Sequence, residues 1–324
     1  MSTTRSGRLR IAIAAGDPAG IGPEISLKAA LDPKVRAVCD PLVVCDPAVL
    51  TRHAQTCGID AGAVTIAACA QPDAAALPFG ATSAASGRAS IAFCRAAIKL
   101  ALTGEVDAVV AAPQNETSVA QAGIAFDGHP SFVARETGTD VDDVYMMLVC
   151  GEMKIAHATL HQSVCDAIAA ITREKVLRII QATDTALRRM GLASPKIAVS
   201  GLNPHAGEGG LFGREEIDII GPAIAAAAAD GIAVTGPFGA DTMFHMAGID
   251  AFIVMLHDQG HVAAKLLSRH ATIALTIGTP ILFSSVAHGS AHDIAGKGVA
   301  NPAAMIEAVL RLSGAGIAHA STTT

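Results

Sequence analysis

The sequence predicts an α/β protein with mostly parallel central sheets, and three observations carry this prediction. First, short runs of β-branched residues alternate with longer segments of helical period along almost the whole chain. Second, the strand-like runs are almost continuously apolar, as in parallel strands that are covered on both faces. Third, 324 residues, 51% of them hydrophobic, are too many for one simple core, so we expect two domains or one large α/β unit.

Individual elements follow from the same patterns. Four segments have the apolar spacing of amphipathic helices: 85–103, 172–191, 214–229 and 302–313. A further helix is expected after the glycine-rich stretch GDPAGIG, with Pro23 in its first turn and Glu24 favourable near its amino end. Eight apolar runs are predicted as strands: 10–15, 41–46, 107–113, 144–150, 154–160, 196–203, 250–256 and 272–278.

Composition excludes several classes of protein. A net charge of −6 argues against nucleic acid or an anionic membrane as the main partner. Seven scattered cysteines without a CxxC pair are typical of reduced thiols in the cytosol. No apolar run has the length of a signal peptide or a membrane span. We therefore expect a soluble, cytoplasmic protein that acts on a small molecule.

Polar clusters follow five of the predicted strands. In open α/β sheets, ligands bind beyond the carboxyl ends of the strands, so we expect these clusters to form one site built from most of the chain. Such a site favours an enzyme over a binding module. The clusters are GDPAGIGPE after residue 15, PQNET from residue 113, HQS from 161, NPHAGEGG from 203 and HDQGH from 257.

Three of the twelve histidines end a predicted strand beside another polar group: His161, His205 and His257. Neutral imidazole suits Zn²⁺ and similar ions, and three protein ligands leave coordination positions open for a substrate. The alternative is ordinary surface or hydrogen-bonded histidines, since there is no HExxH and the three lie dozens of residues apart. His157 and His261 could chelate equally well, because positions four apart share one face of a strand or helix.

Two glycine-containing stretches could bind a nucleotide. GDPAGIG does not fit G-x-G-x-x-G, because its spacing is G-x-x-x-G-x-G with a proline inside, and Asp46 comes too late to serve as the acidic residue of a Rossmann fold. Residues 287–312 place His, Gly, Ser, Asp and Lys before an amphipathic helix. By pattern alone, this second stretch is either a ligand-binding loop or a polar surface loop with a helix cap.

Several long motifs, in order, resemble the 4-hydroxythreonine-4-phosphate dehydrogenase family: GDPAGIGPEI, GLNPHAGEGGLFGREE, GPFGADTMF and MLHDQG. HGSA-DIAGKG-ANP resembles the adenosine-binding loop of isopropylmalate and isocitrate dehydrogenases, which share that family's fold. The resemblance covers about residues 10–313. It implies a homodimer with an isopropylmalate dehydrogenase-like fold, in which two α/β domains flank a cleft. We assign residues 1–125 plus 279–324 to a cofactor-side domain, and 126–278 to a domain for metal, substrate and dimerisation.

The resemblance also implies the residues of the site. It assigns a divalent metal, with zinc expected before magnesium, manganese or cobalt, to His161, His205 and His257, and it leaves His157 and His261 outside the ligand set. It implies that Asp293 accepts a hydrogen bond from a ribose hydroxyl and repels a 2′-phosphate, so NAD is expected over NADP. The catalytic or proton-handling groups are then Asp241, Asp258 and Lys265. The cofactor-binding residues are Gly16, Ser285, His288, Gly289, Ala291, Asp293 and Asn301.

The chain departs from that family where a substrate phosphate is bound. Pro130, Ala274 and Phe283 stand where the family has Thr, Asn and Arg, and Glu116 stands where a Lys is usual. Losing a guanidinium and two neutral donors removes most contacts to a phosphate dianion. Other segments resemble the terephthalate dihydrodiol dehydrogenase branch: APQNETSVAQAGIAFDGHPS, HATLHQSV and HDQGHVAAKLL.

That branch implies NAD-linked, metal-dependent oxidation of 1,2-dihydroxycyclohexa-3,5-diene-1,4-dicarboxylate to protocatechuate, CO₂ and NADH. One alternative is a dehydrogenase of 4-hydroxythreonine 4-phosphate or a related phosphorylated hydroxy acid. A non-enzymatic alternative is a regulator that binds NAD or a metal, against which the intact histidines and Asp293 argue. The residues expected to bind the carboxylated diol are His129, Ser131, Lys265 and Phe283.

Overall fold

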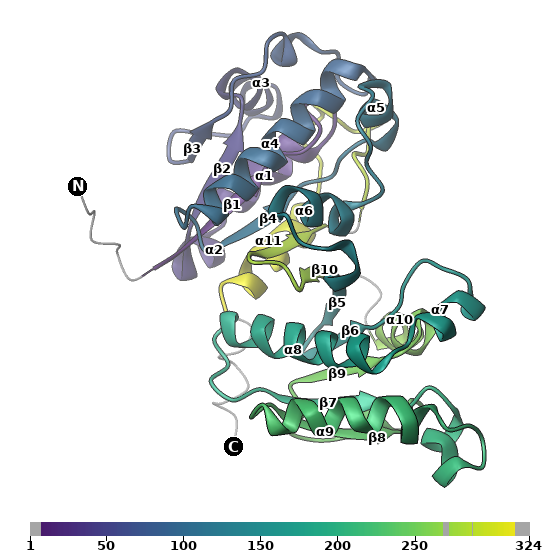
Figure 1. Cartoon of the computed structure of the whole chain (residues 1–324). Coiled ribbons are helices and arrows are strands. Elements are labelled where there is room, and N and C mark those ends of the chain that lie inside the picture. Colours follow the sequence, from purple (N-terminus) through teal and green to yellow (C-terminus); the bar gives the residue numbers. More distant parts are fainter. Residues whose placement is uncertain (1–7, 268–271, 287, 315–324) are drawn as a thin grey trace. The chain divides into compact units, whose positions relative to one another are not determined.

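The computed structural model describes residues 8–267, 272–286 and 288–314 (Figure 1). The chain divides into two compact units, Met1–Thr137 with Pro280–Thr324, and Gly138–Thr279. Both contain strands covered by helices, and most strand pairs are parallel, so the predicted α/β class is confirmed. The first unit extends past residue 125 because the helix that ends at Thr137 packs Phe132 and Val133 into its core.

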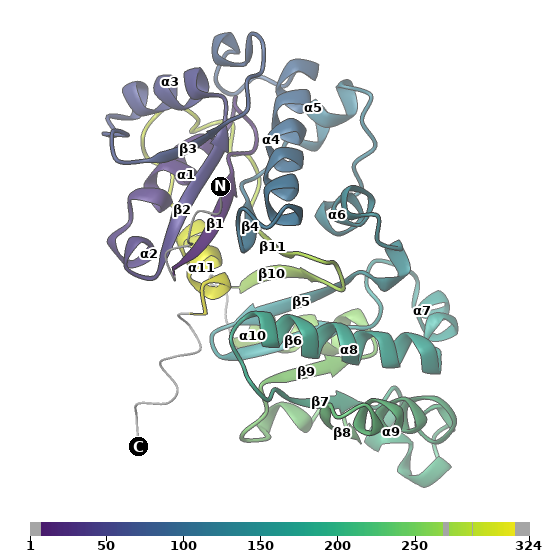
Figure 2. The same cartoon turned by 60° about the vertical axis from the view of Figure 1, so that its left-hand side comes forward.

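The strands of the first unit run in the order β3-β2-β1-β4-β11, and each of these neighbours pairs in parallel (Figure 2). Their parallel direction puts all their carboxyl ends at one edge. The bounds are β1 (Leu9–Ala14), β2 (Cys39–Cys45), β3 (Thr65–Ala68), β4 (Ala108–Ala111) and β11 (Leu282–Ser285).

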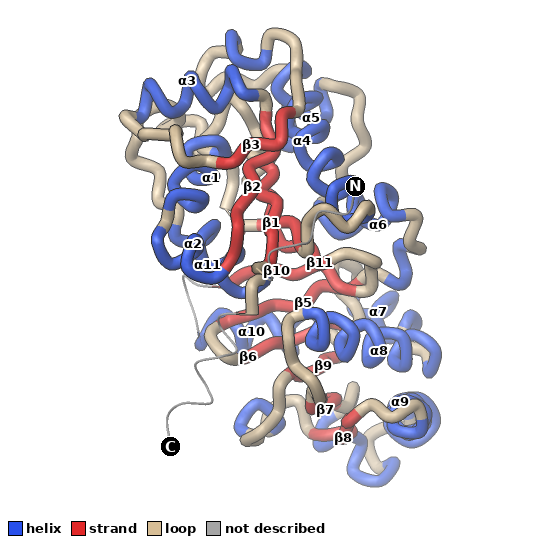
Figure 3. Tube along the Cα trace, turned by 90° about the vertical axis from the view of Figure 1, so that its left-hand side faces the viewer, coloured by secondary structure: helices blue, strands red, loops and turns tan. Residues whose placement is uncertain are grey.

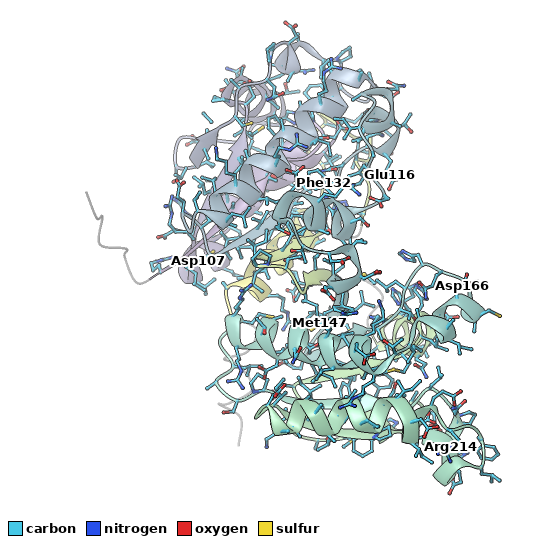
Figure 4. The ribbon with its side chains drawn as sticks, viewed as in Figure 1. Asp107, Glu116, Phe132, Met147, Asp166 and Arg214 are labelled. Atoms are coloured by element: carbon cyan, nitrogen blue, oxygen red, sulfur yellow. The ribbon has the colours of Figure 1, made fainter. Side chains whose placement is uncertain are left out.

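Helices cover both faces of these strands, with α4, α5 and α6 on one face and α1, α2, α3 and α11 on the other (Figure 3). Phe132 of α6 lies inside the resulting core, whereas Glu116 of α5 lies at the surface (Figure 4). The bounds are α1 (Gly22–Leu31), α2 (Pro33–Val38), α3 (Pro47–Cys57), α4 (Ala84–Leu102), α5 (Glu116–Gln121), α6 (His129–Thr137) and α11 (Ala303–Leu312).

The strands of the second unit run in the order β10-β5-β6-β9-β7-β8. The pairs β10–β5 and β5–β6 are antiparallel. For β5 and β6 this follows from the chain turning directly from one strand to the other at Gly151 and Glu152, without the crossover that a parallel pair needs. The bounds are β5 (Tyr145–Cys150), β6 (Met153–His157), β7 (Lys196–Ser200), β8 (Ala233–Phe238), β9 (Ala251–Val254) and β10 (Thr272–Ile277).

Helices α8 and α9 cover one face of these strands and α10 covers the other (Figure 3). The predicted helix 214–229 is divided into a π-helical turn, Glu216–Ile220, and α9. None of the helices in the described ranges has both the length and the apolar character needed to cross a bilayer. The bounds are α7 (Val164–Ala170), α8 (Arg173–Arg189), α9 (Gly221–Ala229) and α10 (His257–Leu267).

Candidate active site

A pocket of about 490 Å³ lies beyond the carboxyl ends of β6 and β9 in the second unit. His161, His257 and Asp258 line it, together with Thr159 and mostly apolar side chains. The ring centroids of His161 and His257 are 5.6 Å apart. The pocket therefore contains two of the three predicted metal ligands and one predicted catalytic carboxylate.

His257 begins α10, with two residues between it and the end of β9, and its ring is hydrogen-bonded to its neighbour Asp258. His257 Nδ1 lies 2.7 Å from Asp258 Oδ1. The hydrogen bond from His257 lowers the pKa of the Asp258 carboxyl below its usual range. A proton on Nδ1 leaves the Nε2 lone pair available, which is the carboxylate–histidine arrangement of many metal ligands. The donor chemistry of the pocket therefore fits a divalent metal at His161 and His257.

Gln259 holds the turn that carries His257. Its Oε1 accepts hydrogen bonds from the Met255 and Leu256 amides at 2.9 and 3.0 Å. Its Nε2 donates to the Gly201 carbonyl at 3.2 Å, so one side chain links the end of β9 to the end of β7. Gln259 was not among the predicted site residues, although its place in the HDQGH motif was a usable signal.

His157 and His261 are close to His257 but do not line the pocket. The His261 ring stacks on His257 with centroids 3.7 Å apart, and the His157 ring is 4.7 Å from His261. Burial lowers the pKa of His157 to about 3, and burial together with His257 lowers the pKa of His261 to about 4. Both imidazoles are therefore neutral at pH 7, and their contacts are with protein groups.

His205 lies in the loop after β7, where the backbone is unusual. Five consecutive residues, from His205 to Gly209, have positive φ angles of 52°, 52°, 78°, 44° and 66°. The His205 ring contacts Phe212, with centroids 6.3 Å apart. Across the described ranges, no three His, Cys, Asp or Glu side chains are arranged to hold one metal ion. The structure thus brings His161 and His257 together but does not bring His205 to them.

A buried carboxylate, Glu216, shapes the His205 loop and was not predicted. Its Oε1 accepts hydrogen bonds from the Leu202 and Asn203 amides, both at 2.8 Å, and its Oε2 accepts one from Asn203 Nδ2 at 3.1 Å. Glu216 lies 13 and 14 residues after the amides that it binds, within a segment that was predicted as a helix. The local sequence pattern therefore gave no sign of this role.

The other two predicted catalytic residues are exposed. Asp241 is on the turn after β8, where a Cβ placed on Gly239 would lie 3.9 Å from the Cα of His205. Asp241 therefore belongs to the His205 side of the unit, whereas Asp258 belongs to the pocket. Lys265 is in the last turn of α10.

The predicted cofactor residues lie on the loop that follows β11 in the first unit. Gly289, Asp293 and Asn301 are exposed, and His288 Nδ1 is 3.2 Å from the Gly289 carbonyl. Asp293 has no hydrogen bond or ion pair with any residue that the structure describes, so its carboxylate is available to a ligand hydroxyl. Asn301 Oδ1 accepts a hydrogen bond from the Ala303 amide at 3.0 Å, at the start of α11. Two further members of the set are Ser285, the last residue of β11, and Ala291, which has a φ of 42°.

The glycine-rich stretch after β1 supports this loop. The Ile21 amide donates to the Ser290 carbonyl at 2.9 Å, and the Ala300 amide donates to Glu24 Oε1 at 2.9 Å. Lys28 Nζ donates to Glu24 Oε1 at 2.7 Å and to the carbonyls of Gly298 and Ala300 at 3.0 and 2.8 Å. The stretch and the helix that follows it therefore hold the loop after β11 in place through hydrogen bonds. This role agrees with the absence of a Rossmann glycine spacing in the stretch.

Gly16 and Asp17 fix the glycine-rich stretch to the end of β4 and to α4. Gly16 has a φ of 69°, and a Cβ there would lie 2.4 Å from the Pro113 carbonyl oxygen, so this position requires glycine. Asp17 is 1% exposed; its Oδ1 accepts from the Ala19 amide at 2.9 Å and from the Ser86 hydroxyl. Contact of Gly16 with a cofactor stays a prediction.

Three predicted substrate-binding residues, His129, Ser131 and Phe283, lie in the first unit. Phe283 is fully buried in the core, and its ring centroid is 5.5 Å from that of His129. Burial lowers the pKa of His129 to about 4, so its ring is neutral at pH 7. Ser131 makes a side-chain hydrogen bond with Asp127. These contacts are within the protein, and the substrate role of the three residues stays a prediction.

Comparison with known proteins adds the following similarities. A family model described as pyridoxal phosphate biosynthetic protein PdxA matches residues 37–311. The chain is 40% identical over 311 residues, 94% of this chain and 96% of the relative, to a 1,2-dihydroxy-3,5-cyclohexadiene-1,4-dicarboxylate dehydrogenase of Comamonas sp. It is 41% identical over 312 residues, 93% and 94% of the two chains, to a 4-hydroxythreonine-4-phosphate dehydrogenase of Burkholderia vietnamiensis. A solved terephthalate 1,2-cis-dihydrodiol dehydrogenase from Burkholderia xenovorans LB400 matches with a TM-score of 0.81 at 41% identity, covering 95% of this chain and 98% of that one.

Proposed function

The chain belongs to the PdxA family, and from that premise we propose that it oxidises a cis-dihydrodiol dicarboxylate with NAD⁺ and releases CO₂. The family resemblance and the fold class predicted from the sequence are confirmed by these relatives, and the chain is an oxidoreductase of the dehydrogenase type. The choice of substrate and the loss of CO₂ are the proposed part.

One observation carries the choice of substrate. A phosphate dianion is bound by several donors, typically including a bidentate guanidinium. At the positions that resemble the family's phosphate-binding residues, this chain has Pro130, Ala274 and Phe283. Phe283 is 0% exposed and packs in the hydrophobic core, so this position offers a phosphate no hydrogen-bond donor. An unphosphorylated dicarboxylate fits these positions better.

A nicotinamide cofactor is proposed on the loop after β11, residues 285–301. The exposed Asp293 carboxylate can accept from a ribose hydroxyl and would repel a 2′-phosphate, which favours NAD over NADP. Hydrogen bonds with Ile21, Lys28 and Glu24 hold the backbone of this loop at Ser290, Gly298 and Ala300, and fixing these points lowers the entropic cost of binding a ligand.

A divalent metal, zinc in the first place, is proposed at His161 and His257, with His205 as the third predicted ligand. When bound, such an ion lowers the pKa of a coordinated hydroxyl and stabilises negative charge on oxygen. Asp258 orients the His257 ring through the bond to Nδ1. Asp241 and Lys265 are the remaining groups proposed to handle protons.

The proposed reaction is an oxidation of the diol by NAD⁺ followed by loss of CO₂. The ring carbon that bears both a hydroxyl group and a hydrogen atom loses hydride to NAD⁺, and its hydroxyl group loses a proton. The products are a β-keto acid and NADH. The bond to the carboxylate then breaks, CO₂ leaves, and the electron pair of that bond enters the ring as an enolate. Protonation of the enolate oxygen gives an aromatic phenol, protocatechuate. The gain of aromaticity favours the loss of CO₂.

A homodimer is also proposed, with the second unit forming the interface. Large apolar side chains are exposed on this unit, and monomeric proteins rarely expose a contiguous apolar patch. Val262, Leu266 and Leu267 of α10 are 54%, 79% and 62% exposed, and Val164 of α7 and Leu211 of the His205 loop are 62% and 73% exposed.

The decisive experiment compares two substrates. We expect NADH formation, followed by its absorbance, with the cis-dihydrodiol dicarboxylate, together with protocatechuate detected by chromatography. 4-Phosphohydroxythreonine should give little or no NADH. Turnover of the phosphate ester alone would refute the proposed substrate and support the second candidate, a phosphorylated hydroxy acid dehydrogenase, which the 41% identity to the Burkholderia vietnamiensis enzyme favours.

The metal is tested separately by His161→Ala, His205→Ala and His257→Ala. Each should lower both bound zinc, measured by elemental analysis, and NADH formation. Full turnover by His205→Ala would remove this residue from the ligand set. Unchanged zinc content and turnover in all three variants would refute the metal site.

A further inference from the structure

We propose that Asp17 and His292 form a positioning pair that holds the dinucleotide loop in its binding conformation. The inference rests on the cofactor proposed above and adds residues for which neither the sequence analysis nor the proposed function had a role. The two residues are 275 positions apart, yet His292 Nε2 lies 2.6 Å from Asp17 Oδ2.

The hydrogen bond between Asp17 and His292 is largely shielded from water. The Asp17 side chain is 1% exposed and that of His292 is 18% exposed, so water cannot readily replace the imidazole. The other carboxylate oxygen, Oδ1, already accepts from the Ala19 amide and the Ser86 hydroxyl. Within the described residues, His292 is the donor that satisfies Oδ2, and a buried carboxylate oxygen without a donor is strongly unfavourable.

The backbone of the loop is fixed at the same place. Ala291 has a φ of 42°, a left-handed conformation that non-glycine residues adopt only when their surroundings impose it. Gly80 packs against the main chain of His292: a Cβ on Gly80 would lie 2.7 Å from the His292 carbonyl oxygen. Asp17 thus holds the side chain of His292, and Gly80 approaches its backbone closely. The next residue, Asp293, is exposed and has no partner among the residues that the structure describes.

The loop has a second, independent attachment. Lys28 and Glu24 hold Gly298 and Ala300 at its far end. Loss of the Asp17–His292 bond should therefore loosen residues 288–294 and leave residues 298–300 in place. This local effect separates a positioning role from a general contribution to folding.

Two variants of His292 provide the test. His292→Phe keeps a ring of similar size and removes the donor. His292→Gln keeps an N–H donor at a similar distance from the backbone and is the matched control. Both are made in the full chain, and NADH affinity is measured by fluorescence titration, kcat and KM for NAD⁺ by NADH formation, and loop order by amide hydrogen exchange.

With His292→Phe, we expect the Kd for NADH and the KM for NAD⁺ to rise about tenfold, the change that one hydrogen bond to a charged group can give. The kcat at saturating NAD⁺ should stay near the wild-type value, amide exchange should accelerate in residues 288–294 but not in 298–300, and His292→Gln should restore each quantity. Wild-type affinity and exchange in His292→Phe would overturn the proposal, as would a His292→Gln variant as impaired as His292→Phe. A wild-type protein that binds no NADH would refute the cofactor instead, and the exchange measurement would still decide whether the pair orders the loop.

Discussion

Among single residues, the buried histidines have the largest consequence for stability. Burial lowers the pKa of His129 to about 4 and that of His157 to about 3, whereas the unfolded chain titrates near the usual value of 6.5. Between these values the unfolded state binds more protons than the folded state. The free energy of unfolding should therefore be fully retained above the unfolded pKa and should fall as the pH drops toward the folded pKa.

Replacing His129 should reduce this pH dependence. In His129→Phe, whose ring would pack beside Phe126 and Phe283, the free energy of unfolding should fall less steeply from about pH 6 to about pH 4, by about 1.4 kcal/mol per pH unit. Urea unfolding at a series of pH values measures the slope. His245→Phe, at an exposed histidine, is the control and should keep the wild-type slope. An unchanged slope in His129→Phe would mean that the pKa of this imidazole is the same in the folded and unfolded states.

At the scale of elements, the side chains of the candidate site are positioned by the carboxyl ends of the strands that precede them. Only Met255 and Leu256 separate β9 from α10, so His257 is held close to the end of the sheet. Helix α10 packs closely on β6 because residue 260 is glycine: a Cβ there would lie 2.3 Å from His157 Nε2 and 2.8 Å from Ile155 Cγ2. The short distance between α10 and β6 thus depends on one missing side chain.

Gly260→Ala should therefore displace the start of α10. Alanine gains about 1 kcal/mol in helix propensity, but overpacking against two buried side chains costs about 1–3 kcal/mol, and a contact as short as 2.3 Å favours the upper end. We expect a lower free energy of unfolding, by about 1–2 kcal/mol in urea titration, and weaker binding of the proposed metal. Gly289→Ala, with no atom within 4 Å of its Cβ, should leave unfolding unchanged. A Gly260→Ala variant as stable as wild type would show that α10 shifts without cost.

The sequence predicted the elements better than the contacts between them. All eight predicted strands overlap observed ones, whereas β3, β8 and β11 were not predicted. β3 is a mostly exposed edge strand, β8 contains Gly236 and Pro237, and β11 ends in two serines, so none of them has the continuous apolar run of the others. His161, His257 and Asp258 meet because strand ends converge, which a sequence can indicate. Glu216 and the Asp17–His292 pair owe their roles to partners brought close only by folding, and no local spacing encodes such partners.

For the whole molecule, the exposed apolar side chains of the second unit are the feature with the widest effect. If α10 lies in a homodimer interface, each Leu266 would lose most of its contact with water on association. Full burial of a leucine contributes about 1.5–3 kcal/mol, so such side chains can account for a large part of the affinity.

Leu266→Glu should therefore weaken the proposed dimer. In the proposed interface the variant would bury a carboxylate in place of a leucine side chain. We therefore expect the dimer dissociation constant to rise at least tenfold, which corresponds to a loss of about 1.4 kcal/mol of association free energy. Sedimentation velocity over a range of concentrations measures it. Leu102→Glu, at a 46% exposed leucine of the first unit, should sediment like wild type. A monomeric wild-type protein, or dissociation by Leu102→Glu alone, would contradict the assigned interface.

The first unit is assembled from both ends of the chain, and this has a consequence for the order of synthesis. The ribosome delivers β4 and Glu24 long before β11 and Ala300, their partners in the finished unit. A nascent chain therefore holds β4 with one unpaired edge and Glu24 without the Ala300 amide until translation is nearly complete. The loop proposed to bind the dinucleotide is among the last parts of the unit to be delivered, so an unfinished chain cannot bind the cofactor there.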